Sequence, residues 1–223
     1  MATELADGVW WFDLGRVNAY LYEAGEPVLV DAGTPGSAAA LRDGIEAAGH
    51  RPEDVGHVLV THYDVDHVGG LERLDDAMDA TVYARAPGVE HLRGAANPSV
   101  TTLKGISQRF MGLSVAAPEL PVESIDDGDE VAGLTAYATP GHTAGHTAFV
   151  DAQVAFLGDL VVGDHGRLDV PPWYLNRHTA AVRESVRSLA ERTPPFEVAA
   201  PGHGDPLPAD GHEALSALGA GTA

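Results

Sequence analysis

Four potential metal ligands are concentrated in one short loop of the sequence. The loop Thr61-His62-Tyr63-Asp64-Val65-Asp66-His67-Val68-Gly69-Gly70 directly follows the apolar run Val58-Leu59-Val60. A strand followed by a ligand-rich loop and two glycines is an arrangement that holds a metal at the edge of a sheet. Imidazole and carboxylate groups both bind divalent cations. The loop therefore predicts a metal centre.

Three segments further along the chain also place His or Asp at turns marked by glycine. They are Pro140-Gly141-His142-Thr143-Ala144-Gly145-His146-Thr147, Phe156-Leu157-Gly158-Asp159 and Pro201-Gly202-His203-Gly204. This order resembles the metallo-β-lactamase superfamily, whose signature is H-x-H-x-D-H followed by a distant His, Asp and His. The resemblance runs from about Asp31 to His203. It implies an αββα sandwich that carries a dinuclear hydrolytic site.

The resemblance assigns the candidate ligands to two divalent metal ions. The first ion would be held by His62, Asp64 and His142. The second would be held by Asp66, His67 and His203, and Asp159 would bridge the two ions. The resemblance also gives Asp66 the catalytic role of handling the proton of the attacking water. A structural role is the ordinary explanation for a single histidine, but it is a weaker explanation for an ordered set.

Asp64 departs from the family pattern, because the family usually has its middle histidine at this position. An aspartate Oδ lies two bonds beyond Cβ, as a histidine Nδ1 does, so Asp64 could bind in the same place. The added negative charge makes iron or manganese alternatives to zinc, which stays the favoured metal. Related diiron flavoproteins also carry a carboxylate there, as glutamate. If Asp64 pointed away from the site, one metal would be lost.

Several other residues are weaker candidates for a role in this site. Asp31 ends a strand where the family keeps an aspartate that braces the metal loop, although a turn cap is an equal alternative. His146 follows His142 by four positions and is expected to orient the metal ligands. Two irregular segments could form a lid over the substrate, although packing in the core is a slightly better explanation of their apolar residues. Their candidate lid residues are Phe110, Met111, Trp173 and Tyr174.

The predicted elements that would position these residues form two runs of strands with helices outside them. We expect strands at Val9–Leu14, Asn18–Glu23, Pro27–Asp31, Val58–Thr61, Thr81–Ala84, Leu134–Thr139, Thr147–Asp151, Val154–Leu157 and Glu197–Ala200. Hydrophobic spacing and flanking glycines predict helices at Ala38–Ala48, Gly69–Met78 and Thr179–Arg192. The pattern predicts an α/β fold of the αββα four-layer type. No repeat or linker divides the chain, so residues 1–223 are expected to form a single domain.

Composition limits the classes of partner and of cofactor. The 223 residues include 13 basic and 33 acidic side chains, for a formal charge of −20. Such a charge repels nucleic acid and anionic membranes. The absence of cysteine excludes thiolate ligands and disulfides, and the N-terminus lacks signal-peptide features, so we expect a cytoplasmic protein. Dispersed acidity with Lys104 as the single lysine favours a halophilic origin over an ordinary acidic protein.

Together these features predict a metal-dependent hydrolase that acts on a small molecule. The resemblance implies a metal-bridging hydroxide that attacks an ester, thioester or lactone. The alternative is a diiron redox or oxygen-handling protein of the same fold, which Asp64 would favour and which would need a separate electron donor. A metal-free binding protein is disfavoured because every other ligand position is intact.

Overall fold

The computed structural model describes residues 2–94 and 117–221 and contains two principal β-sheets. The first sheet has seven strands, β1(Ala2–Ala6), β2(Val9–Asp13), β3(Asn18–Ala24), β4(Glu26–Val30), β5(His57–Leu59), β6(Thr81–Ala84) and β7(Val122–Ser124). The second has five, β8(Glu130–Val131), β9(Leu134–Ala138), β10(Thr147–Val150), β11(Val154–Gly158) and β14(Val198–Pro201). A separate ribbon pairs β12(Val162–Asp164) with β13(Arg167–Asp169).

Each sheet combines an antiparallel part with a parallel part. Strands β1 to β4 form an antiparallel meander, and β4, β5, β6 and β7 pair in parallel. Strands β8 to β11 are antiparallel, and β14 joins β11 in parallel at the other edge. Parallel neighbours end at the same edge of a sheet. Loops that follow these strands are therefore brought close together.

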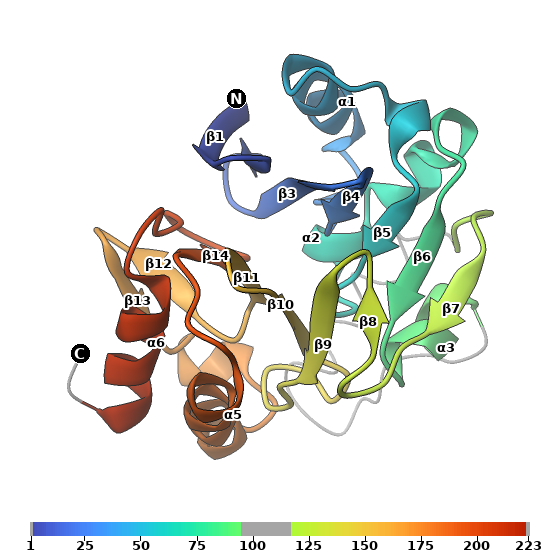
Figure 1. The fold of residues 1–223 in the computed structure, drawn as a ribbon. Coiled ribbons are helices and arrows are strands. Elements are labelled where there is room, and N and C mark those ends of the chain that lie inside the picture. Colours follow the sequence, from blue (N-terminus) through green and yellow to red (C-terminus); the bar gives the residue numbers. More distant parts are fainter. Residues whose placement is uncertain (1, 95–116, 222–223) are drawn as a thin grey trace.

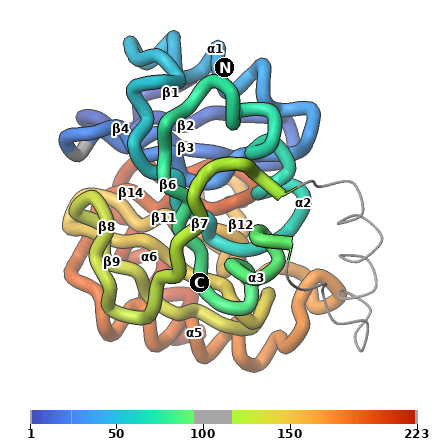
Figure 2. Tube along the Cα trace, turned by 90° about the vertical axis from the view of Figure 1, so that its right-hand side faces the viewer, coloured from blue at the N-terminus to red at the C-terminus, as the bar shows by residue number. Residues whose placement is uncertain are grey.

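The helices lie on the two outer faces, so the molecule has four layers (Figures 1 and 2). Helices α1(Ala38–Ala47), α2(Val65–Val68) and α3(Gly88–Leu92) pack on the first sheet, through a cluster that includes Leu41, Val68 and Val89. Helices α5(Thr179–Arg192) and α6(Gly211–Ala220) pack on the second, through a cluster that includes Val186 and Leu215. Single 3-10 turns lie at η1(Pro52–Asp54), η2(Leu71–Arg73), η3(Asp75–Ala77) and η4(Trp173–Leu175).

A third apolar cluster fills the space between the two sheets. It joins Tyr20 and Val28 of the first sheet to Phe149 and Phe156 of the second, with the Tyr20 and Phe156 ring centroids 5.5 Å apart. Neighbouring residues in a strand point to opposite faces, and here both faces are covered. This explains why β4 and β11 are apolar almost throughout. The αββα sandwich predicted from the sequence is confirmed.

The predicted helix at Gly69–Met78 was wrong. The structure has helix α2 before this segment and the short turns η2 and η3 within it. A Cβ at Gly69 would lie 2.3 Å from the Val65 carbonyl oxygen, and one at Gly70 would lie 2.2 Å from that of Ala32. The two glycines therefore allow close backbone packing rather than helix propagation.

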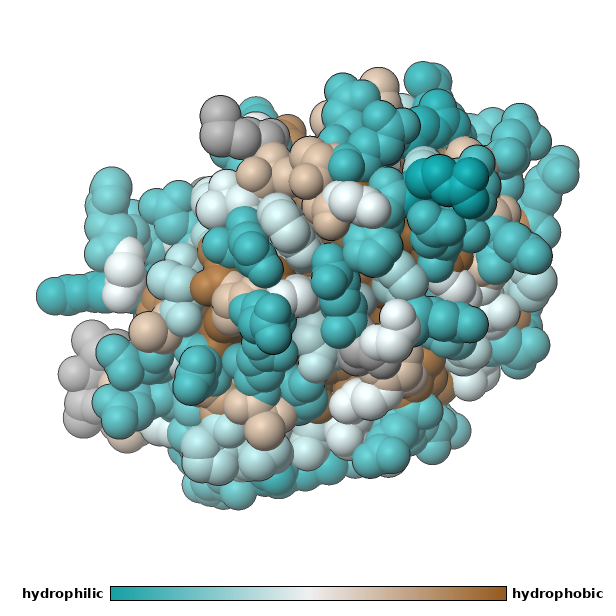
Figure 3. All heavy atoms as spheres, turned by 45° about the horizontal axis from the view of Figure 1, so that its top comes forward, coloured by the Kyte–Doolittle hydropathy of each residue, from teal (hydrophilic) through white to brown (hydrophobic). Residues whose placement is uncertain are grey.

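One face of the molecule is predominantly polar. On the face shown in Figure 3, hydrophilic residues cover most of the area and hydrophobic residues are visible mainly between them. Within residues 2–94 and 117–221, none of the helices combines the length and the apolar character that a membrane span requires.

Candidate metal centre

The predicted ligand segments meet where strands of both sheets end. The loop from Thr61 to His67 follows β5, Asp159 follows β11, and His203 follows β14. His142 lies in the connection between β9 and β10. Backbone hydrogen bonds join these segments, from Thr147 to Thr61 and from Gly202 to Gly158. Parallel pairing in both sheets thus brings ligands separated by up to 141 residues in the sequence into one site.

Glycine at position 202 allows the second strand end to approach the site closely. A Cβ there would lie 2.4 Å from Asp159 Oδ1 and 2.7 Å from His67 Cε1, both too close for any side chain. Its backbone N–H also donates to the carbonyl of Gly158. The glycine before His203 is therefore required for packing around the candidate ligands.

The candidate ligands form two groups, and the carboxylate of Asp159 lies close to both of them. One group comprises His62, His142 and Asp159, and the other comprises Asp66, His67 and His203, with the ligand atoms of each group within 4.8 Å of one another. Asp159 Oδ2 lies 3.1 Å from His142 Nε2 and 3.8 Å from His62 Nε2. Asp159 Oδ1 lies 3.3 Å from His67 Nε2 and 3.4 Å from His203 Nε2.

Two further carboxylates face these groups. Asp64 Oδ2 lies 3.3 Å from His62 Nε2 and 3.2 Å from His142 Nε2, so Asp64 points into the first group. Asp66 Oδ2 lies 3.5 Å from His203 Nε2. The structure therefore brings together all seven residues that the sequence indicated as ligands.

The donor set fits divalent metal ions. His62 Nε2, His67 Nε2 and Asp159 Oδ1 are buried and have no hydrogen-bond partner among the residues that the structure describes. A buried polar atom left unpaired costs about 1–3 kcal/mol. Three such atoms facing one another, in a set of four imidazoles and three carboxylates, are explained by cations that they would coordinate. First-row transition metals suit this mixture of nitrogen and oxygen donors.

Electrostatic interactions inside the site shift several pKa values. Burial opposes protonation of His203, but Asp159 and Asp66 outweigh it and raise the pKa of His203 to about 10. Burial likewise opposes protonation of His67, while Asp159 and Asp31 raise its pKa well above the ordinary value. Burial opposes ionisation of Asp159, yet His67 and His142 hold its pKa well below the ordinary value. A cation entering the site must therefore displace protons from His67 and His203.

Each of the four candidate ligand histidines is held through Nδ1, which leaves Nε2 facing the site. A histidine that donates from Nδ1 presents the lone pair of Nε2 to a metal. The Nδ1 partners are Thr61 Oγ1 at 3.0 Å for His62, Asp31 Oδ2 at 2.8 Å for His67, Asn176 Oδ1 at 3.1 Å for His142 and the Arg16 carbonyl for His203.

Asn176 is a supporting residue that sequence reasoning missed. Its amide nitrogen donates to the Pro171 carbonyl at 3.0 Å, so its oxygen faces His142. Asn176 is separated from His142 by 34 residues. No motif surrounds it, so the sequence carries no signal for this contact. Thr61 was also missed, although its place between strand β5 and the first ligand was a usable signal.

Asp31 and His146 lie beside the ligand groups. Asp31 is buried with a left-handed backbone (φ 58°), and its carboxylate accepts from Thr61 N, Thr61 Oγ1 and His67 Nδ1. Such strain in a non-glycine residue is common at functional sites. His146 is buried, with Nδ1 2.7 Å from Thr139 Oγ1 and its ring centroid 5.2 Å from that of His62. His146 Nε2 has no hydrogen-bond partner within the described part of the chain.

Two of the four predicted lid residues can be placed. Trp173 and Tyr174 in η4 are 74% and 54% exposed, so they do not pack in the core. Their segment is fixed to the β9–β10 connection that carries His142, because Arg177 N donates to the His142 carbonyl. Phe110 and Met111 lie outside the described residues.

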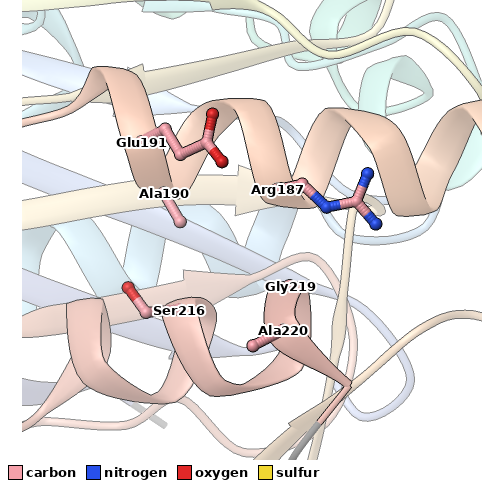
Figure 4. Close-up of a pocket in the computed structure, with 6 residues that line it drawn as sticks. All are labelled: Arg187, Ala190, Glu191, Ser216, Gly219 and Ala220. Atoms are coloured by element: carbon pink, nitrogen blue, oxygen red, sulfur yellow. The ribbon is translucent and has the colours of Figure 1, made fainter.

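A separate hollow of about 220 Å³ lies between α5 and α6. Figure 4 shows Arg187 and Glu191 extending from α5, with Ser216 and Ala220 on α6 opposite. Within residues 2–94 and 117–221, the groups of His, Asp and Glu that could hold a metal are the two described above. The α5–α6 hollow therefore does not compete with them as a candidate metal site.

Comparisons with known proteins agree with this geometry. A probable metallo-hydrolase of Bacillus subtilis, YflN, is 28% identical over 92% of this chain and 86% of its own. A hydroxyacylglutathione hydrolase of Shewanella baltica is 31% identical over 60% of this chain, but this match spans only 43% of that enzyme. The fold is similar to that of BJP-1, a subclass B3 metallo-β-lactamase of Bradyrhizobium japonicum. The TM-score is 0.72 at 21% identity, over 99% of this chain and 90% of that chain.

The profile of the metallo-β-lactamase superfamily matches residues 12–203, which include both ligand groups and most of both sheets. The chain belongs to the metallo-β-lactamase superfamily.

Proposed function

We propose that this protein is a dinuclear metal-dependent hydrolase that cleaves an ester, thioester or lactone bond of a small molecule. The observation that carries the proposal is the position of Asp159, whose two carboxylate oxygens face different ligand groups. The names of the relatives, a metallo-hydrolase and a hydroxyacylglutathione hydrolase, support a hydrolytic reaction. We also propose that residues 1–223 act as one domain, because both sheets supply ligands and share the central apolar layer.

The chain's own residues would position and deprotonate the attacking water. Two bound cations would lower the pKa of a water between them and polarise the substrate carbonyl. Burial opposes ionisation of Asp66, but its hydrogen bond with His203 and the charge of His67 hold its pKa below the ordinary value. Asp66 is therefore ionised at neutral pH and can accept a proton from the water. His62, His67, His142 and His203 would hold the cations through Nε2.

Zinc is the metal that we favour, because four imidazoles suit it. The contacts of Asp64 with His62 and His142 support the alternative, since three carboxylates also suit iron or manganese. A diiron redox protein working with a separate electron donor would use the same residues.

One experiment separates hydrolysis from redox chemistry. Zinc-loaded protein should hydrolyse a 4-nitrophenyl ester, a thioester or a lactone under argon with no reductant. Removal of zinc by a chelator should lower the rate at least about 10³-fold, because the water then keeps its high pKa, and added zinc should restore the rate. Asp159→Asn serves as the inactive control. Reduction of oxygen or nitric oxide by iron-loaded protein, without turnover of any of the three hydrolytic substrates, would instead establish the redox alternative.

We propose that the exposed Trp173 and Tyr174 contact the substrate at the mouth of the site. Their rings lie 5.9 Å apart, edge to face. Exposed aromatic residues on a segment fixed to a candidate ligand loop are well placed to cover the apolar part of a substrate.

We also propose that the acidic surface is an adaptation to high salt. The Debye length falls from ~10 Å at 0.1 M salt to ~3 Å at 1 M, so molar salt should relieve repulsion within a chain of charge −20. We expect the melting temperature to rise by about 6 °C or more between 0.05 M and 2 M NaCl, which is about 2 kcal/mol for a protein of this size. Sucrose at equal osmolality is the control. A melting temperature that rises as steeply with sucrose as with NaCl would count against the adaptation. A melting temperature that does not change with NaCl would also count against it.

A further inference from the structure

A chain of buried hydrogen bonds connects one candidate ligand of each group to the same carboxylate oxygen. His67 Nδ1 lies 2.8 Å from Asp31 Oδ2, and Thr61 Oγ1 lies 2.7 Å from the same Oδ2 atom. His62 Nδ1 lies 3.0 Å from Thr61 Oγ1. All four residues are 3% exposed or less, so water does not compete for these contacts. The chain runs from His62 through Thr61 to Asp31 and then to His67.

The protons in this chain can be assigned from the chemistry of the groups. A carboxylate only accepts, so the single hydroxyl proton of Thr61 is donated to Asp31 Oδ2. The lone pairs of Thr61 Oγ1 then accept from Nδ1–H of His62. His67 must likewise donate from Nδ1 to Asp31. His62 therefore keeps the tautomer whose Nε2 lone pair is directed toward its ligand group, and His67 keeps the same tautomer once a cation has displaced its second proton.

We propose that Thr61 is a positioning residue that couples the two ligand groups, by placing His62 under the control of the same Asp31 carboxylate that holds His67. The inference rests on the dinuclear site proposed above. Neither group is then an independent unit, because the orientation of the Asp31 carboxylate fixes one histidine in each. The backbone N–H of Thr61 donates to Asp31 Oδ1 at 2.8 Å, which fixes that orientation.

Thr61→Val is the direct test, because valine keeps the shape and burial of threonine and removes only the hydroxyl. Loss of a hydrogen bond to a ligand histidine typically weakens metal binding 10–100-fold. We expect a loss of about that size for the zinc ion bound by His62, and a change of less than about threefold for the ion bound by His67. Chelator-competition titrations measure both zinc affinities. The imidazole resonances of His62 and His67 show which affinity belongs to which ligand group. Thr61→Ser keeps the hydroxyl, so it should retain most of the zinc affinity that Thr61→Val loses.

Thr139→Val is the matched control. It also removes a buried threonine hydroxyl that contacts a histidine Nδ1, but that histidine is His146, which lies in neither ligand group. A loss of zinc affinity as large in Thr139→Val as in Thr61→Val would overturn the proposal.

The coupling itself is tested by a double-mutant cycle. In a protein that is otherwise wild type, Asp31→Asn should weaken zinc binding in both ligand groups. In the Thr61→Val background, Asp31→Asn should weaken the affinity for the zinc ion bound by His67. The affinity for the zinc ion bound by His62 should stay within about threefold of its value in the Thr61→Val single variant. Equal effects of Asp31→Asn on the His62 ion in both backgrounds would overturn the coupling. If the Asp31→Asn variant does not fold, the comparison of Thr61→Val, Thr61→Ser and Thr139→Val still decides the role of Thr61.

The tautomer of His62 gives a readout that does not need a metal. Long-range ¹H–¹⁵N correlations on metal-free protein should show the Nδ1–H form of His62 in the wild type and a mixture of forms in Thr61→Val. An unchanged tautomer in that variant would overturn the proposal. Wild-type protein that takes up no metal would refute the dinuclear site, but a shift of the His62 tautomer in Thr61→Val would still support the hydrogen-bond chain.

Discussion

Asp159→Asn should lower the metal content from about two ions per chain to fewer than one and reduce the rate of hydrolysis at least about 10³-fold. Asp159 faces both ligand groups, with one oxygen 3.1 Å from His142 Nε2 and the other 3.3 Å from His67 Nε2. The amide keeps the shape of the carboxylate but presents only one oxygen and carries no charge. One metal therefore loses its ligand atom, the other keeps only a neutral amide oxygen in place of a carboxylate oxygen, and the two cations lose their shared counter-charge.

Metal analysis of protein purified without added metal measures the first effect, and the rate of ester hydrolysis measures the second. Asp127→Asn is the matched control, because Asp127 is half-exposed and pairs with Arg192 at 2.8 Å, outside both ligand groups. This variant should keep wild-type metal content and rate. A loss of only one ion in Asp159→Asn, with the other bound at wild-type affinity, would show that Asp159 serves a single metal and would rule out the bridging role.

The strand ends were predictable from the sequence because chemistry and hydrophobicity coincide there. The apolar runs of β5 and β11 are each followed at once by a ligand segment, and burial on both faces of a strand leaves an almost continuous apolar pattern. The amphipathic helix Thr179–Arg192 was predicted with the bounds that the structure has. In these places the local pattern and the tertiary packing favour the same structure.

Contacts between distant segments were not predictable in this way. Asn176 supports His142 only because the segment before α5 folds back onto the loop between β9 and β10. The exposure of Trp173 also could not be read from its residue type, because aromatic residues are usually buried. The segment Gly69–Met78 has helical spacing, but its glycines allow backbone contacts that only the folded chain reveals. In each case tertiary packing decides the outcome.

Asp64→Ala should remove one of the two metals and lower the rate at least about 100-fold, while the fold survives. The carboxylate of Asp64 lies 3.3 Å from His62 Nε2 and 3.2 Å from His142 Nε2, so it is placed to complete the coordination of the first metal. It is 9% exposed and lies in a loop, not in the apolar core, so truncation leaves the packing of the sheets intact. Metal analysis and the melting temperature of the variant check these two expectations.

Asp64→His tests the meaning of the departure from the family pattern. A neutral imidazole removes one negative charge and adds a nitrogen donor, so the variant should favour zinc over iron or manganese more strongly than the wild type does. With less negative charge around the cations, the attacking water should become more acidic, and the rate of hydrolysis should reach its plateau at lower pH. Asp64→Asn is the control, because it removes the charge without adding the nitrogen. If Asp64→Ala kept wild-type metal content and rate, Asp64 would be no ligand, and His62, His142 and Asp159 alone would hold the first metal.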